Sequence, residues 1–113
     1  MSLHLDARRE AVVRQLLRRI APDLEVWAFG SRVHGRGLKP FSDLDLVVLG
    51  EGAGVERRCV ELRGAFEESN LPFHVDVVEW VCLDEMFRDI VRRERLVLQA
   101  PEPAAIGGAR SRE

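Results

Sequence analysis

The chain has 113 residues, of which 46% are hydrophobic and 32% charged, and its formal net charge is −2. This length fits one small domain, and the composition is that of an ordinary soluble globular protein. Because acidic residues lie close to most of the arginine clusters, the charge pattern argues against a surface for direct nucleic-acid or membrane binding.

The cysteines and the start of the chain indicate where the protein works. Cys59 and Cys82 lie far apart and lack the spacing of a zinc site or of a disulfide framework. No basic-then-apolar signal segment follows Met1, and no apolar run approaches the length of a membrane span. We therefore expect a cytoplasmic protein.

The first half of the chain predicts a helix and two strands joined by a glycine-rich loop. Residues 7–20 carry apolar side chains at helical spacing, and Asp6 precedes them as a candidate N-cap. Residues 24–29 are short and apolar and end at a glycine, which predicts a strand. A loop rich in glycine and basic residues covers 30–42, and residues 43–49 have the apolar run of a buried strand.

The second half predicts two more helices and two more strands. Apolar residues repeat at helical spacing over 55–66, so Cys59 is expected to face the core. Residues 74–80 predict a strand, and Asp84 is a candidate cap for a last helix. Residues 96–98 predict a short edge strand.

This order of elements predicts an α/β (α+β) fold in which helices flank a small mixed β-sheet. We expect residues 1–100 to form this single domain. Residues 101–113 contain Pro, Ala, Gly and Arg and have nothing to bury, so we expect a disordered tail.

Gly30 and Ser31 follow the first predicted strand directly. Glycine lets the backbone approach a ligand closely, and the residues after it can begin a helix whose free N–H groups face a phosphate. Ser31 adds a hydroxyl, while Arg32, His34 and Arg36 add positive charge nearby. A Gly-Ser pair after a strand is more often only a turn, so this motif alone is weak evidence for a phosphate site.

Asp43 and Asp45 stand on either side of Leu44 at the start of the second predicted strand. Side chains alternate along a strand, so residues two apart project from the same face. Two neighbouring carboxylates in an apolar segment call for a cation or a raised pKa. An alternative is equally compatible with this motif alone: Asp43 caps a turn and Asp45 points to solvent.

Asp76 is a charge in the middle of the third predicted strand. Buried unpaired carboxylates are rare and costly. If this strand lies beside the strand of Asp43 and Asp45, the three carboxylates meet at one end of the sheet, where their hard oxygen ligands suit Mg²⁺. The alternative has Asp76 on an exposed face of the sheet.

Taken together, these motifs resemble the polymerase-beta nucleotidyltransferase superfamily. The resemblance rests on residues 29–32 (Phe-Gly-Ser-Arg), residues 42–46 (Ser-Asp-Leu-Asp-Leu) and the later Asp76 in a hydrophobic strand. More narrowly, the sequence resembles the minimal nucleotidyltransferases of bacteria and archaea, over a range from about Leu3 to Gln99. Those proteins are encoded beside a HEPN-domain protein and act as the antitoxin of the pair.

The resemblance implies roles for individual residues. It assigns the nucleotide to Gly30, Ser31 and Arg32. It assigns metal binding and catalysis to Asp43, Asp45 and Asp76. Asp76 matches the aspartate that completes the metal site and can activate the attacking hydroxyl. Eleven residues separate Ser31 from Asp43, where ten are common in the family, and a glycine-rich loop absorbs an extra residue more easily than a strand.

The resemblance also implies an activity, with two Mg²⁺ ions and ATP as substrate: AMP is transferred to a hydroxyl and pyrophosphate leaves. In the antitoxin branch the acceptor resembles a tyrosine of the HEPN toxin. This chain contains no Tyr, so an acceptor tyrosine must belong to a partner. We therefore expect a hetero-oligomer with a HEPN-domain protein encoded nearby.

Two other functions remain compatible with the sequence. One is a binding-only antitoxin that keeps the fold and masks the toxin sterically. The other is a nucleotide-binding subunit that completes an enzyme only together with its partner chain.

Overall fold

A computed structural model describes residues 2–101 of the chain. Its helices are α1 (Ala7–Ile20), α2 (Ser31–His34), α3 (Ala53–Glu67) and α4 (Glu85–Glu94), with a 3-10 turn at Trp80–Cys82. Its strands are β1 (Val26–Phe29), β2 (Leu44–Val48), β3 (Val75–Glu79) and β4 (Leu96–Gln99). The strands form one sheet in the order β3-β2-β1-β4. β2 and β3 are parallel, whereas β1 is antiparallel to both β2 and β4. The predicted small mixed sheet flanked by helices is confirmed.

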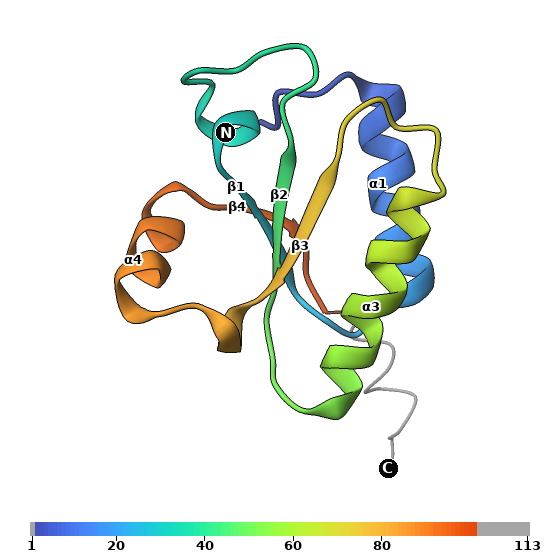
Figure 1. Cartoon of the computed structure of the whole chain (residues 1–113), viewed down its shortest axis with the longest axis vertical. Helices are drawn as coiled ribbons and strands as arrows, with labels where there is room; N and C mark the ends of the chain where they lie inside the picture. Colours follow the sequence, from blue (N-terminus) through green and yellow to red (C-terminus); the bar gives the residue numbers. More distant parts are fainter. Residues whose placement is uncertain (1, 102–113) are drawn as a thin grey trace.

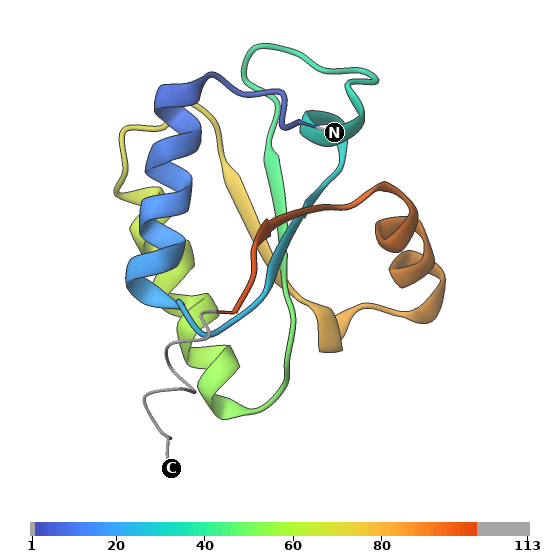
Figure 2. The ribbon, with the colours of Figure 1, turned by 180° about the vertical axis from the view of Figure 1, so that it is seen from behind.

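The crossover between β2 and β3 decides how the layers are arranged. Parallel neighbours need a long connection, and α3 supplies it. α1 and α3 lie together on one face of the sheet, while α4 lies on the opposite face (Figure 1). In the reverse view, β4 runs along β1 before the described chain ends (Figure 2). The end of β1 and the beginnings of β2 and β3 therefore meet at one end of the sheet.

Local sequence signals set the helix ends. The Asp6 carboxylate accepts a hydrogen bond from the backbone N–H of Arg9, and Asp84 accepts one from that of Phe87, so both predicted N-caps are confirmed. α2 ends after one turn because Gly35 adopts a left-handed conformation, with φ of +80°.

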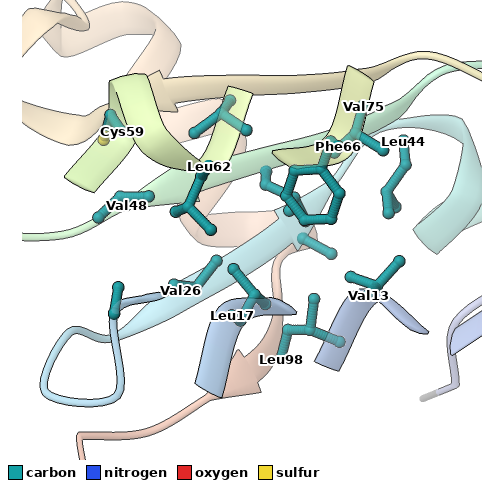
Figure 3. Packing of buried hydrophobic residues seen from close by; sticks show 14 of the residues in the cluster. Val13, Leu17, Val26, Leu44, Val48, Cys59, Leu62, Phe66, Val75 and Leu98 are labelled. Atoms are coloured by element: carbon teal, nitrogen blue, oxygen red, sulfur yellow. The ribbon is translucent and has the colours of Figure 1, made fainter. Parts of the chain in front are cut away.

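The main core fills the space between the sheet and the α1–α3 pair (Figure 3). Val13 and Leu17 of α1 are fully buried against Cys59 and Leu62 of α3, which confirms that Cys59 faces the core. β2 contributes alternate residues to this core, namely Leu44, Leu46 and Val48. The residues between them must therefore face the α4 side.

On the α4 side the packing is thinner. Phe29, Val47 and Val91 form a small buried cluster, and Trp27 packs edge-to-face on Trp80 with ring centroids 5.3 Å apart. Part of this face stays open, since α4 is the one helix that covers it within residues 2–101.

The predicted helices and strands are all present, with differences at the strand ends. The structure also has the short helix α2 inside the predicted loop 30–42 and a 3-10 turn at Trp80–Cys82, where the sequence predicted the end of a strand. The first strand begins at Val26 rather than at Leu24, because the N–H of Leu24 donates to the carbonyl of Ala21 in the turn that follows α1. The predicted disordered tail lies outside the described residues, apart from Pro101. No helix within residues 2–101 is long and apolar enough to span a membrane.

Candidate active site

β1 runs directly into a sharp turn at Gly30. Gly30 has φ of +83° and ψ of −161°, a region that residues with a Cβ avoid. A Cβ added at Gly30 would overlap Oδ2 of Asp45, so the Gly30 backbone lies directly against that carboxylate. The first hydrogen bond of the following turn runs from Val33 N to the Gly30 carbonyl. The N–H groups of Ser31 and Arg32 precede it and have no partner within α2.

The register of the sheet brings Asp45 beside Asp76. The two residues are aligned on the parallel strands β2 and β3, and Asp45 is also paired with Phe29, the residue before Gly30. Aligned positions on adjacent strands project from the same face of a sheet. Asp43 lies just before β2, so all three predicted carboxylates lie at the end of the sheet where β1 ends.

The three carboxylates differ in exposure. Asp45 is partly buried, whereas Asp43 and Asp76 are exposed. Burial raises the pKa of Asp45 to about 6, and the negative charges of Asp76 and Asp43 contribute to this rise. The argument that Asp76 is a buried carboxylate is wrong, because alternation along β3 turns Asp76 away from the main core.

These carboxylates have the chemistry of a magnesium site. Mg²⁺ prefers oxygen ligands and is often held by one or two carboxylates, with water and substrate phosphates as the remaining ligands. Among residues 2–101, no three His, Cys, Asp or Glu side chains come together closely enough to hold an ion, so the expected cluster of Asp43, Asp45 and Asp76 is not formed. Asp45 and Asp76 therefore fit as protein ligands of an ion whose shell the substrate completes, rather than as parts of a closed protein cage.

A cavity of about 350 Å³ opens beside the carboxylates. Asp45, Asp76 and Gly30 line one side of it, and Phe87 and Ile90 of α4 form an apolar wall on another. The other lining residues are Phe29, His34, Val78, Val91 and Glu94. Gly30, the carboxylates of Asp45 and Asp76, and α4 thus surround one space that can receive a ligand, whereas Ser31, Arg32 and Asp43 do not line it.

Comparison with known proteins identifies this arrangement. The family model of the nucleotidyltransferase domain matches residues 11–99. The chain belongs to this family. The match spans all four strands and the three segments that carry the predicted site residues, so the predicted nucleotidyltransferase class is confirmed.

One curated protein is similar over most of its length. The chain is 42% identical over 100 residues to a probable protein adenylyltransferase, MntA, of Haemophilus influenzae. The aligned part covers 87% of each protein. This confirms the resemblance to minimal nucleotidyltransferases that the sequence motifs indicate.

Two of the solved structures similar to this nucleotidyltransferase illustrate the shared fold. A minimal nucleotidyltransferase shares 29% identity with a TM-score of 0.53, covering 82% of this chain and 96% of that one. The complex of a tri-AMPylated Shewanella oneidensis HEPN toxin with an MNT antitoxin contains a chain with 20% identity and a TM-score of 0.50. That match covers 82% of this chain and 71% of the other, and it bears on the fold alone.

In this nucleotidyltransferase Arg32 is buried. Its guanidinium donates to the carbonyls of Ser42 and His4, at 2.9 Å each, and to that of Pro40 at 3.0 Å. Desolvation lowers the pKa of Arg32. These contacts give Arg32 a structural role, because they hold together the N-terminal segment and the loop between α2 and β2. A direct contact of Arg32 with nucleotide stays a prediction.

The eleven-residue connection from Ser31 to Asp43 contains a hydrogen-bonded turn just before β2. Lys39 N donates to Ser42 Oγ at 2.8 Å, and Ser42 N donates back to the Lys39 carbonyl at 3.1 Å. Gly37, with φ of +68°, allows the chain to reverse ahead of this turn.

Sequence reasoning missed what α4 contributes to the nucleotidyltransferase site. Phe87, Ile90 and Val91 form an apolar stripe at helical spacing, but Phe87 and Ile90 are 37% and 44% exposed, and of the three only Val91 is buried. Phe87, Ile90 and Glu94 recur every three or four residues and share one helix face toward the cavity. That spacing is a sequence signal for the face, although it does not distinguish a cavity wall from a core.

Proposed function

We propose that this nucleotidyltransferase transfers AMP from ATP to a hydroxyl group of a HEPN-type toxin and thereby acts as its antitoxin. Two similarities support the proposal. The relative with 42% identity is named a protein adenylyltransferase, and a structural neighbour is a complex of an AMPylated HEPN toxin with its antitoxin.

The observation that carries the proposal is the alignment of Asp45 with Asp76 beside the Gly30 turn, in one cavity. The turn offers backbone N–H groups to phosphate oxygens, and the carboxylates offer oxygen ligands to a cation. Mg²⁺ bound there would supply charge neutralisation and Lewis acidity at the phosphates. This combination suits phosphoryl chemistry better than a binding function alone.

In the proposed reaction the acceptor oxygen attacks the α-phosphorus of ATP. The bond from that phosphorus to the β-phosphate oxygen breaks, and pyrophosphate leaves. Asp76 is exposed on the edge strand β3, so its carboxylate can face the acceptor and take the hydroxyl proton. Asp45 and Asp76 would hold the cation at the phosphates, with Asp43 next to them just before β2, and Ser31 would donate to a phosphate oxygen.

The acceptor belongs to another chain, and we propose that it is a tyrosine. This chain has no tyrosine of its own. The proposed contact surface is the apolar side of α4 next to the cavity, where Met86, Phe87 and Ile90 are 78%, 37% and 44% exposed. A partner bound there brings a hydroxyl within reach of Asp76.

Intact-mass spectrometry tests the proposal. The purified protein is mixed with the HEPN-type protein encoded beside it, Mg²⁺ and each nucleoside triphosphate in turn. We expect AMP adducts on the partner with ATP, and none with the Asp43→Asn variant. Silencing of the toxin that survives Asp43→Asn without any adduct would contradict the transferase and establish the binding-only antitoxin.

A further inference from the structure

The edge of the cavity carries an ion pair that the proposed reaction does not use. Glu94, the last residue of α4, lines the cavity, and Arg36 from the loop after α2 donates to its carboxylate. The two residues are 58 positions apart in the sequence. Their contact joins the loop beside the Gly-Ser turn to the end of α4.

The position of Glu94 at the end of α4 is unfavourable for a negatively charged carboxylate. Glu94 lies at a helix C-terminus, where backbone carbonyls already carry negative partial charge. It also faces a cavity that contains Asp45 and Asp76, and a nucleoside triphosphate would bring further negative charge there. The hydrogen bond from Arg36 is the main cause that lowers the pKa of Glu94, and the charges of Arg36, His34 and Arg93 add to it.

The backbone of Arg36 is fixed by a hydrogen bond, whereas its side chain is exposed to solvent. Its backbone N–H donates to His34 Nδ1 at 2.9 Å, and His34 itself lines the cavity. The Arg36 side chain is 68% exposed, so apart from Glu94 little restrains its guanidinium. An exposed ion pair contributes little free energy in water, and a guanidinium binds phosphate oxygens in a bidentate manner. The Arg36 guanidinium can therefore leave the Glu94 carboxylate for a phosphate group at little cost in free energy.

We propose that Arg36 is a phosphate-binding residue, which Glu94 holds in the nucleotide-free protein and which the β- and γ-phosphates of a nucleoside triphosphate take over. The inference rests on the proposed function, since it requires a triphosphate beside α2. Glu94 then has two effects. It keeps Arg36 at the edge of the cavity, and it competes with the nucleotide for the same guanidinium.

Calorimetric titration of three proteins with a nonhydrolysable ATP analogue and with AMP, in the presence of Mg²⁺, tests this proposal. Arg36→Gln should weaken binding of the ATP analogue by about tenfold, the loss of one charge-assisted hydrogen bond. Glu94→Gln should tighten that binding by about threefold, because the competing carboxylate is gone. Binding of AMP should be unchanged in both variants, since AMP lacks the β- and γ-phosphates.

A second exposed ion pair provides matched controls. Arg58 donates to Asp23 away from the cavity, with side chains 30% and 45% exposed. Arg58→Gln and Asp23→Asn change the net charge in the same way and should leave both affinities unchanged.

An ATP-analogue affinity that Glu94→Gln lowers or leaves unchanged would overturn the proposal. So would an Arg36→Gln variant that weakens binding of AMP as much as binding of the analogue. If the wild-type protein binds the analogue but the two variants match the Arg58→Gln and Asp23→Asn controls, this inference alone fails. If the wild-type protein binds no nucleotide at all, the proposed function fails with it.

Discussion

A methyl group at position 30 would occupy space that the carboxylate of Asp45 fills. Gly30→Ala should therefore displace Asp45 from Asp76, and it also forces a strained backbone that costs about 1–3 kcal/mol. We expect AMP transfer to fall by about a hundredfold or more, since a misplaced catalytic group is that costly. Transfer rates and thermal unfolding of the same preparation measure the two effects separately.

Gly37 offers a control for the strain. It also has a positive φ, of +68°, but no atom lies within 4 Å of the place where its Cβ would be. Gly37→Ala should lower the melting temperature and retain AMP transfer. Equal loss of transfer in both variants would show that backbone strain, and not displacement of Asp45, is the cause.

Asp45 should destabilise the metal-free protein near neutral pH. Its pKa rises from the ordinary 3.8 to about 6 on folding. The folded state therefore holds more protons between these two values, so the free energy of unfolding falls as pH rises through that window. The penalty is at most about 3 kcal/mol, and partial exposure reduces it. With a chelator present, Asp45→Asn should melt higher than wild type at about pH 7.5, and the difference should disappear near about pH 4.

Divalent metal should make the wild-type protein melt higher than Asp45→Asn, the reverse of the order expected with a chelator. Binding at a hundred times the dissociation constant stabilises a folded protein by about 2.7 kcal/mol. Mg²⁺ with an ATP analogue should therefore raise the melting temperature of wild type and leave Asp45→Asn unchanged. A wild-type melting curve indifferent to both additions would count against these carboxylates as the metal site.

The residues of the site were predictable to different degrees. Asp43, Asp45 and Asp76 stand out in the sequence, because charges in apolar strands need an explanation. The role of Arg32 cannot be read from the sequence, because a basic residue beside a Gly-Ser pair can either contact phosphate or be buried and hold neighbouring segments together. Only the carbonyls of His4, Pro40 and Ser42 around its guanidinium reveal the second role, and nothing local in the sequence makes them its neighbours.

Among the elements within residues 2–101, α4 carries the largest group of exposed apolar side chains, namely Met86, Phe87 and Ile90. Met86 and Ile90 are 78% and 44% exposed on it. If the toxin binds there, replacing both with serine should weaken the complex by about tenfold or more, as expected for buried interface anchors. The affinity of the purified pair measures the effect.

Val60 on α3 provides the comparison. It is 64% exposed, and α3 lies on the opposite side of the sheet (Figure 1). Val60→Ser should leave the affinity for the toxin unchanged. A larger loss with Val60→Ser than with the α4 variant would move the interface to the α1–α3 side.

The presence of most helices and strands could be predicted from hydrophobic periodicity and N-caps, but the residues at which they begin and end could not always be predicted. The helix over Ala7–Ile20 was predictable because Asp6 caps it and Pro22 follows it. The start of β1 was not, because the hydrogen bond from Leu24 to Ala21 belongs to a turn that apolar composition does not reveal.

At the scale of the whole molecule, the order of the strands was the part that the sequence left open. The three carboxylates form one site only if β3 lies next to β2. That neighbourhood depends on α3 crossing over the sheet and burying Cys59 and Leu62 against α1. Such contacts join segments far apart in the chain, and no local pattern encodes them.

The last strand of the sheet pairs with the first one. Leu98 of β4 is 2% exposed within the main core, and the side chain of Gln99 donates to the carbonyls of Ala21 and Leu24. In a chain that lacks residues 96–99, one edge of β1 would therefore have no hydrogen-bonding neighbour, and the main core would lose Leu98. An unpaired strand edge is a template for aggregation. The site at the far end of β1 thus depends on a segment that contributes no residue to it.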